Sequence, residues 1–221
     1  DTMIWFTSDF HFGHEKEFLW QPRGFLNWED HAEQVIQNFN EMVKPNDTVY
    51  ILGDCMLKND DFGITCLKRL NGNKFLAIGN HDSEKRIERY EQAKIFKEIQ
   101  YGYRLKEGKY TFWCQHYPAM MGNYKDKVPT ICLAGHTHSP EKFQNMEAGC
   151  YNVALDAHKC YPVSIDEIIT DIREYRKTHP VVEYLDKSPY CNSCARGDSC
   201  STRFNHDLTC PGFIQAQKEI S

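Results

Sequence analysis

The chain has 221 residues, of which 41% are hydrophobic, and a formal net charge of −5 at pH 7. This length accommodates one large domain, or one domain with a small appendage. The negative charge argues against a broad basic surface for binding long nucleic acids. No apolar run reaches the roughly 18 residues of a transmembrane helix, and residues 1–9 lack the basic and apolar regions of a signal peptide, so we expect no membrane association.

Short apolar runs and helical spacing of apolar residues alternate along the first 93 residues. Such alternation is typical of a parallel sheet with connecting helices. Residues 10–28 carry many aromatic residues without a clear period, and we expect a loop there. We expect strands over residues 3–7, 48–52 and 74–78, and helices over residues 29–43, 62–70 and 83–93.

The pattern changes after residue 93, where short apolar runs follow one another with turns between them. A last helical period begins at Ile165 and extends to about Lys177. The segment after it is polar and then rich in cysteine, so we divide the chain into a main domain, residues 1–177, and an extension, residues 178–221. We expect strands in the second part of the main domain over residues 96–101, 103–105, 110–114, 131–134, 150–155 and 162–164.

Five short motifs in the main domain carry residues that bind metals or move protons. All except the one around His81 directly follow an apolar or aromatic run, so we expect them on turns after strands. Asp-x-His and His-x-His place two side chains on the same face of an extended segment. The motifs are Asp9-Phe10-His11, Gly53-Asp54, Gly79-Asn80-His81-Asp82, His116 and Gly135-His136-Thr137-His138.

These motifs supply two carboxylates, four imidazoles and one amide. Any one of them alone is a weak signal, because a lone histidine is more often a core residue than a ligand. One ion cannot use seven such ligands and keep an open position, whereas two ions that share a carboxylate can. Mixed nitrogen and oxygen ligands suit manganese, iron, zinc or nickel. The predicted ligands are Asp9, His11, Asp54, Asn80, His116, His136 and His138.

Together with the flanking segments Ser8–His14, Lys44–Tyr50 and Asn152–Asp156, the motifs resemble the calcineurin-like metallophosphoesterases, especially small bacterial and bacteriophage members. The resemblance covers about residues 3–172. It implies an α/β fold, the four-layer αββα sandwich, and a binuclear centre whose hydroxide attacks phosphorus.

The resemblance also implies a role for each residue. Asp9, His11 and His138 would hold the first ion, Asn80, His116 and His136 the second, and Asp54 would bridge both. His81 would be the general acid, oriented by Asp82, or would only contact the phosphoryl oxygens electrostatically.

The substrate is less well defined by the sequence. Arg23 and His14 are candidate substrate contacts, although Arg23 could equally be a solvated loop charge. The segment after Asp54, Cys-Met-Leu-Lys, departs from many family members. We favour a phosphodiesterase acting on small nucleotides. The alternatives are a phosphomonoesterase, a nuclease, or a scaffold without turnover.

Ten cysteines are present. Six are scattered singly, several of them in apolar runs, and indicate buried free thiols in a cytoplasmic protein rather than a disulfide framework. The other four, Cys191, Cys194, Cys200 and Cys210, crowd into the extension. Four thiolates at this spacing favour one structural zinc, with an iron–sulfur cluster as the alternative. We expect the extension to be a metal-binding segment that could contact a protein partner.

Overall fold

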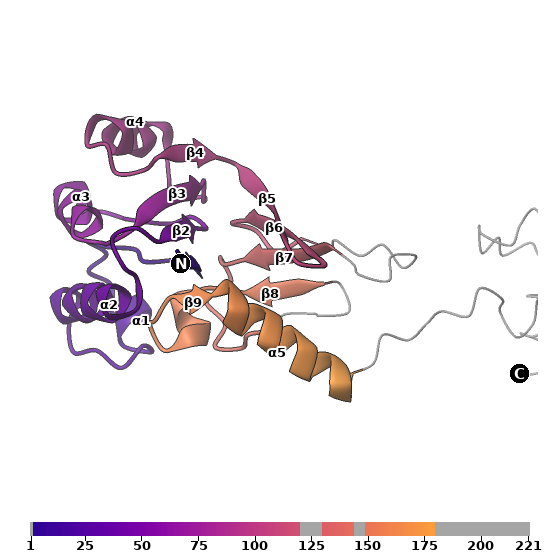
Figure 1. Cartoon of the computed structure of the whole chain (residues 1–221). Coiled ribbons are helices and arrows are strands. Elements are labelled where there is room, and N and C mark those ends of the chain that lie inside the picture. The colour runs from indigo at the N-terminus through magenta and orange to yellow at the C-terminus, as the bar shows by residue number, and fades with distance from the viewer. Residues whose placement is uncertain (1, 120–129, 144–148, 180–221) are drawn as a thin grey trace, which may run out of the picture. The chain divides into compact units, whose positions relative to one another are not determined.

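The computed structural model describes residues 2–119, 130–143 and 149–179. The chain forms a mixed α/β fold with two sheets flanked by helices (Figure 1), as predicted. The four cysteines of the extension lie outside the described residues. No helix in the described part of the chain combines the length and apolar character needed to cross a membrane.

The first sheet has the strand order β4-β3-β2-β1-β9. Its four strands β1 to β4 run parallel, and β9 joins β1 antiparallel. The predicted parallel sheet is therefore confirmed. The bounds are β1 (Ile4–Thr7), β2 (Thr48–Ile51), β3 (Asn73–Ala77), β4 (Glu98–Gln100) and β9 (Val163–Ser164).

Three helices, α2 (Trp28–Met42), α3 (Asp60–Lys68) and α4 (Glu84–Gln92), lie beside this sheet (Figure 1). The first two begin slightly earlier than predicted because an asparagine caps each of them. Asn27 accepts a hydrogen bond from the Asp30 N–H, and Asn59 accepts one from the Phe62 N–H. A short helix, α1 (Glu17–Trp20), occupies part of the predicted loop over residues 10–28.

The second sheet has the order β5-β6-β7-β8. Its bounds are β5 (Gly102–Glu107), β6 (Tyr110–Gln115), β7 (Thr130–Ala134) and β8 (Cys150–Asn152). The pair β5 and β6 is antiparallel, while β6, β7 and β8 are parallel to one another. The carboxyl ends of β6 and β7 therefore lie at one edge of this sheet.

The prediction of a strand through residue 155 was wrong after Asn152. There the Asn152 amide oxygen accepts a hydrogen bond from the Ala154 N–H, the local turn that asparagine favours over an extended chain. A 3₁₀ helix, Leu155–His158, follows.

Two apolar clusters hold the fold together. One joins α2, α3 and α4 to the first sheet. The other lies between residues of both sheets and the last helix, α5 (Ile165–Thr178), whose Ile168 and Ile172 are fully buried. The six cysteines of the described chain are buried and free, as predicted.

Replacing Ile168 by alanine tests the second cluster. Because the side chain is 0% exposed, we expect a loss of about 2–5 kcal/mol in the free energy of unfolding, from lost burial and the remaining cavity. Arg173→Ala on the exposed side of α5 is the control, expected to change stability by about 0.5 kcal/mol or less. Urea unfolding measures both, and equal losses would contradict the packing.

Candidate metal centre

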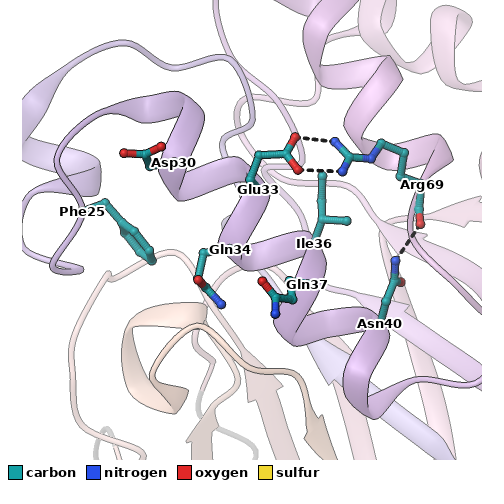
Figure 2. A pocket seen from close by; sticks show the side chains of 8 residues that line it. All are labelled: Phe25, Asp30, Glu33, Gln34, Ile36, Gln37, Asn40 and Arg69. Carbon is teal, nitrogen blue, oxygen red and sulfur yellow. Dashed lines mark hydrogen bonds and ion pairs between the residues drawn. The ribbon is translucent and has the colours of Figure 1, made fainter.

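A surface hollow of about 460 Å³ lies along α2, lined in part by Asp30, Glu33 and Arg69 (Figure 2). Its only ion pair, among the residues lining it, is formed by Glu33 and Arg69, whose two N–H···O distances are 2.5 and 2.7 Å. The Glu33 carboxylate is therefore already paired with a cation. None of the predicted metal ligands lines the hollow.

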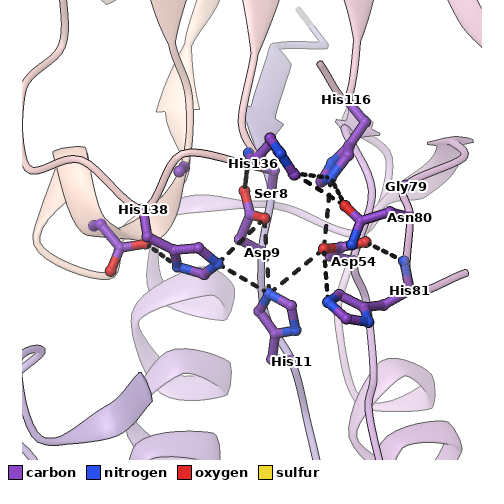
Figure 3. Close-up of polar contacts among 12 residues, drawn as sticks. Ser8, Asp9, His11, Asp54, Gly79, Asn80, His81, His116, His136 and His138 are labelled. Atoms are coloured by element: carbon purple, nitrogen blue, oxygen red, sulfur yellow. Dashed lines mark hydrogen bonds and ion pairs between the residues drawn. The ribbon is translucent and has the colours of Figure 1, made fainter. Parts of the chain in front are cut away.

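The predicted ligands come together at the carboxyl ends of strands from both sheets (Figure 3). Two hydrogen bonds join the sheets there. The His136 N–H donates to Asp9 Oδ2 at 2.9 Å, and His116 Nδ1 donates to the Leu52 carbonyl at 2.8 Å. Each bond runs between one sheet's turn and the other's, so the two halves of the site are mutually positioned.

The turns after the strands have unusual backbone conformations. Five of the predicted ligands have positive φ angles, between 49° and 71°: Asp9, His11, Asp54, His136 and His138. Residues other than glycine rarely adopt this region, and such strain is found mainly at functional sites.

Two positions in these turns require glycine because a ligand side chain lies directly against the backbone. At Gly53, with φ +93°, an added Cβ would lie 2.5 Å from His116 Nδ1. At Gly135 an added Cβ would lie 2.3 Å from Asp9 Oδ2. Both contacts are far inside van der Waals distance, so only glycine fits without displacing a predicted ligand.

A first group of ligand atoms forms around His11. Its Nε2 lies 3.2 Å from His138 Nε2, 3.8 Å from Asp9 Oδ1 and 3.7 Å from Asp54 Oδ2. His138 Nε2 lies 3.8 Å from the same Asp9 oxygen. The atoms of Asp9, His11 and His138 are close enough to share one ion.

A second group forms around His116. Its Nε2 lies 2.8 Å from Asn80 Oδ1, 3.1 Å from His136 Nδ1 and 3.5 Å from Asp54 Oδ2. The same oxygen of Asp54 therefore approaches the nitrogens of both groups.

The donor set fits divalent cations. Asp9 Oδ1 is buried and has no hydrogen-bond partner among the described residues, which is costly unless a cation meets it. In neutral His116 the proton is on Nδ1, since that atom contacts a carbonyl that can only accept. Its Nε2 then presents a lone pair to the oxygen of Asn80, an arrangement that a cation stabilises and that is otherwise repulsive.

Ionisation of Asp9 favours cation binding. Burial opposes its negative charge, but contacts with His11, His116 and His138 outweigh burial and lower the pKa to about 2. The carboxylate is therefore charged at neutral pH, as a metal ligand must be.

His81 lies beside Asp54, but Asp82 does not orient it as the sequence suggested. The Asp82 carboxylate accepts hydrogen bonds from the N–H groups of Asp54, Gly79 and Cys55, and from the Tyr90 hydroxyl. It organises the turns after β2 and β3 instead. The His81 N–H donates to Asp54 Oδ1 at 2.8 Å, and its ring is 39% exposed.

Neither predicted substrate contact faces solvent. The Arg23 side chain is 2% exposed, and each of its nitrogens contacts a protein acceptor. His14 is 6% exposed, and its ring centroid lies 6.2 Å from that of His11. Burial is the main cause that lowers the pKa of His14 to about 4, and the nearby His11 and His81 lower it further.

Sequence reasoning missed Asp156. This carboxylate binds Arg23 and contacts His138 Nδ1 at 3.1 Å. It lies in the 3₁₀ helix Leu155–His158, directly after the predicted strand over residues 150–155, so its direction could not be read from the pattern. Burial disfavours its charge, but the hydrogen bonds from His138 and Arg23 hold its pKa below the usual range.

Fold and site together define a metal-dependent hydrolase. The profile of the calcineurin-like phosphoesterase family matches residues 2–118, more than half of the chain. The chain belongs to this family, and it is a metal-dependent phosphoesterase.

Similar proteins include the uncharacterized protein MJ1445 of Methanocaldococcus jannaschii, 28% identical over 172 residues that span 75% of this chain and 89% of that protein. The gene 66 protein of Mycobacterium phage D29 is 28% identical over 199 residues, 77% of this chain and 98% of that protein. Among solved structures, the protein of unknown function AQ665 from Aquifex aeolicus shares the fold, with a TM-score of 0.62, 24% identity, and coverage of 77% of this chain and 99% of that one.

The contact between Arg23 and His31 predicts a pH effect on stability. Arg23 Nη1 lies 3.0 Å from His31 Nε2. Burial is the main cause that lowers the His31 pKa to about 3, and the positive charge of Arg23 is the second. Between pH 3 and pH 6.5 the unfolded chain binds a proton that the folded one does not, so stability is lost as pH falls. With metal removed, we expect wild type to lose about 2 kcal/mol more than His31→Gln between pH 7 and pH 5.

Urea unfolding at both pH values measures this difference. His179→Gln changes an exposed histidine at the end of α5 and should keep the pH dependence of wild type. If His31→Gln also keeps it, His31 is not held neutral.

Proposed function

We propose that the chain is a binuclear phosphoesterase that acts on phosphodiesters of nucleotide type. The observation that carries the proposal is the position of Asp54. One oxygen, Oδ2, lies 3.7 Å from His11 Nε2 and 3.5 Å from His116 Nε2, which supports a carboxylate shared by two ions. In this assignment Asp9, His11 and His138 hold one ion, and Asn80, His116 and His136 the other.

The bound ions, of manganese, iron, zinc or nickel, would supply a hydroxide nucleophile near neutral pH and offset the phosphoryl charge. The protein's own part is to hold the ligands. Two hydrogen bonds fix Asp54: its backbone N–H donates to the Asp82 carboxylate, and the backbone N–H of His81 donates to its Oδ1. His81 is the candidate proton donor to the leaving oxygen, because its exposed ring lies at the edge of the site, with Nε2 3.9 Å from Asp54 Oδ2.

An exposed aromatic side chain supports a nucleotide diester as substrate. The Tyr117 ring is about half exposed and stacks edge-on against His136, with centroids 4.7 Å apart. An exposed ring at this place could pack against a base or a sugar. We assign neither Arg23 nor His14 to substrate, because both are buried. A phosphomonoesterase or a nuclease is the alternative.

For the extension we propose one structural zinc held by Cys191, Cys194, Cys200 and Cys210, with an iron–sulfur cluster as the alternative. Support comes from the spacing of the four cysteines alone. The extension would then fold around its metal and could bind a protein partner.

Asp54→Asn tests the shared carboxylate. Loss of its charge should lower kcat/KM by at least ~100-fold, because even residues behind metal ligands cost 10–100-fold, and should reduce the metal content of the purified protein. Asp30→Asn, at an exposed position of α2, is the matched control and should retain both. Full activity of Asp54→Asn would refute the binuclear mechanism.

The substrate class is tested on protein reloaded with manganese, by comparing a chromogenic phosphodiester with its monoester. We expect the diester to be hydrolysed faster, because its second ester group can pack against the exposed Tyr117 ring. A preference for the monoester would make the protein a phosphatase and overturn the diester assignment. Wild-type protein treated with a chelator is the blank.

A further inference from the structure

Arg23 connects parts of the site that are far apart in sequence. Its Nε and Nη2 donate to the two oxygens of Asp156 at 2.9 and 2.8 Å, a bidentate pair. Its Nη2 also donates to the backbone carbonyl of Asp9 at 2.9 Å, and its Nη1 contacts His31. With the side chain 2% exposed, the guanidinium is held in one place.

Asp156 passes this constraint to His138. Its Oδ2 lies 3.1 Å from His138 Nδ1, so Nδ1 carries the proton and Nε2 keeps its lone pair. That Nε2 is the atom directed at His11 and Asp9. The contact of Nδ1 with Arg23 Nη2 is longer, 3.4 Å. A guanidinium can only donate, and Nη2 already donates to Asp156 and to the Asp9 carbonyl, so the carboxylate is the partner of Nδ1.

We propose that the Arg23–Asp156 pair is a positioning device for one of the two metal subsites, the one formed by Asp9, His11 and His138. It fixes the tautomer and ring direction of His138 and the backbone at Asp9. This inference rests on the proposed binuclear centre and adds a difference between its two halves. A carboxylate behind a ligating histidine orients the ring and strengthens its metal binding.

The second subsite has a separate anchor. His116, its central ligand, donates from Nδ1 to the Leu52 carbonyl and makes no contact with Asp156 among the interactions of the described residues. Disturbing Asp156 should therefore weaken one ion and leave the other. General loss of stability would affect both.

The test uses the full-length protein, stripped with a chelator and titrated with Mn²⁺ alone. Calorimetry measures the affinity of each ion, and electron paramagnetic resonance distinguishes a coupled pair from a single ion. We expect two ions in wild type. In Asp156→Asn we expect one ion at wild-type affinity and the other weakened 10–100-fold, with the coupled signal lost at equal metal.

Three further variants isolate the cause. Asp156→Glu keeps the charge and a partner for Arg23 but displaces the carboxylate from His138, so it should weaken the same ion even if Asp156→Asn does not fold. Glu33→Gln breaks the exposed bidentate pair with Arg69 (Figure 2) and should bind both ions normally. Ile172→Ala in the apolar cluster lowers stability and should leave both affinities unchanged.

If every folded Asp156 variant binds two ions with wild-type affinity, the inference is overturned and the binuclear centre still stands. Equal weakening of both ions, or selective weakening also in Ile172→Ala, would overturn it in favour of a general stabilising role. A single ion in wild type would instead refute the binuclear centre, and the inference with it.

Discussion

The site depends on close contacts between ligand atoms where the turns of the two sheets meet. His116 Nε2 and Asn80 Oδ1 are 2.8 Å apart, and the Nε2 atoms of His11 and His138 are 3.2 Å apart. The first of these contacts is repulsive without a cation, because the His116 proton lies on Nδ1, so metal binding and the meeting of the sheets are linked. The apolar cluster between the sheets opposes this repulsion by holding the strand ends together.

Hydrogen bonds donated by the backbone make the arrangement specific. Asp82 receives three N–H groups from the turns after β2 and β3 and a hydroxyl from Tyr90, so a single buried carboxylate positions two neighbouring turns. Backbone at positive φ costs about 1–3 kcal/mol for a residue other than glycine, and Asp54 is one of five predicted ligands in that region. Four hydrogen bonds to Asp82 help to offset that cost at the turn that carries Asp54.

Much of the site could be predicted because its ligands come directly after apolar runs. Parallel strands bring such positions to one edge, which is why Asp9 and Asp54, expected on turns after strands, lie close together. Asp82 shows the limit, since the family resemblance implied that it orients His81, whereas the turn directs its carboxylate to backbone N–H groups. Asp156 shows a second limit: it lies 133 residues from Arg23, and no local pattern reports such a pairing.

The two halves of the proposed centre differ in charge as well as in anchoring. His138 is supported by a carboxylate that is itself paired with a buried cation, whereas His116 is supported by a neutral carbonyl. Asp9 adds a full negative charge to the first half, and the amide of Asn80 adds none to the second. Because a charged acceptor raises the basicity of the imidazole that donates to it, the first half presents the stronger field to a cation. The two ions of such a centre would therefore not be equivalent, although Asp54 would help to hold both.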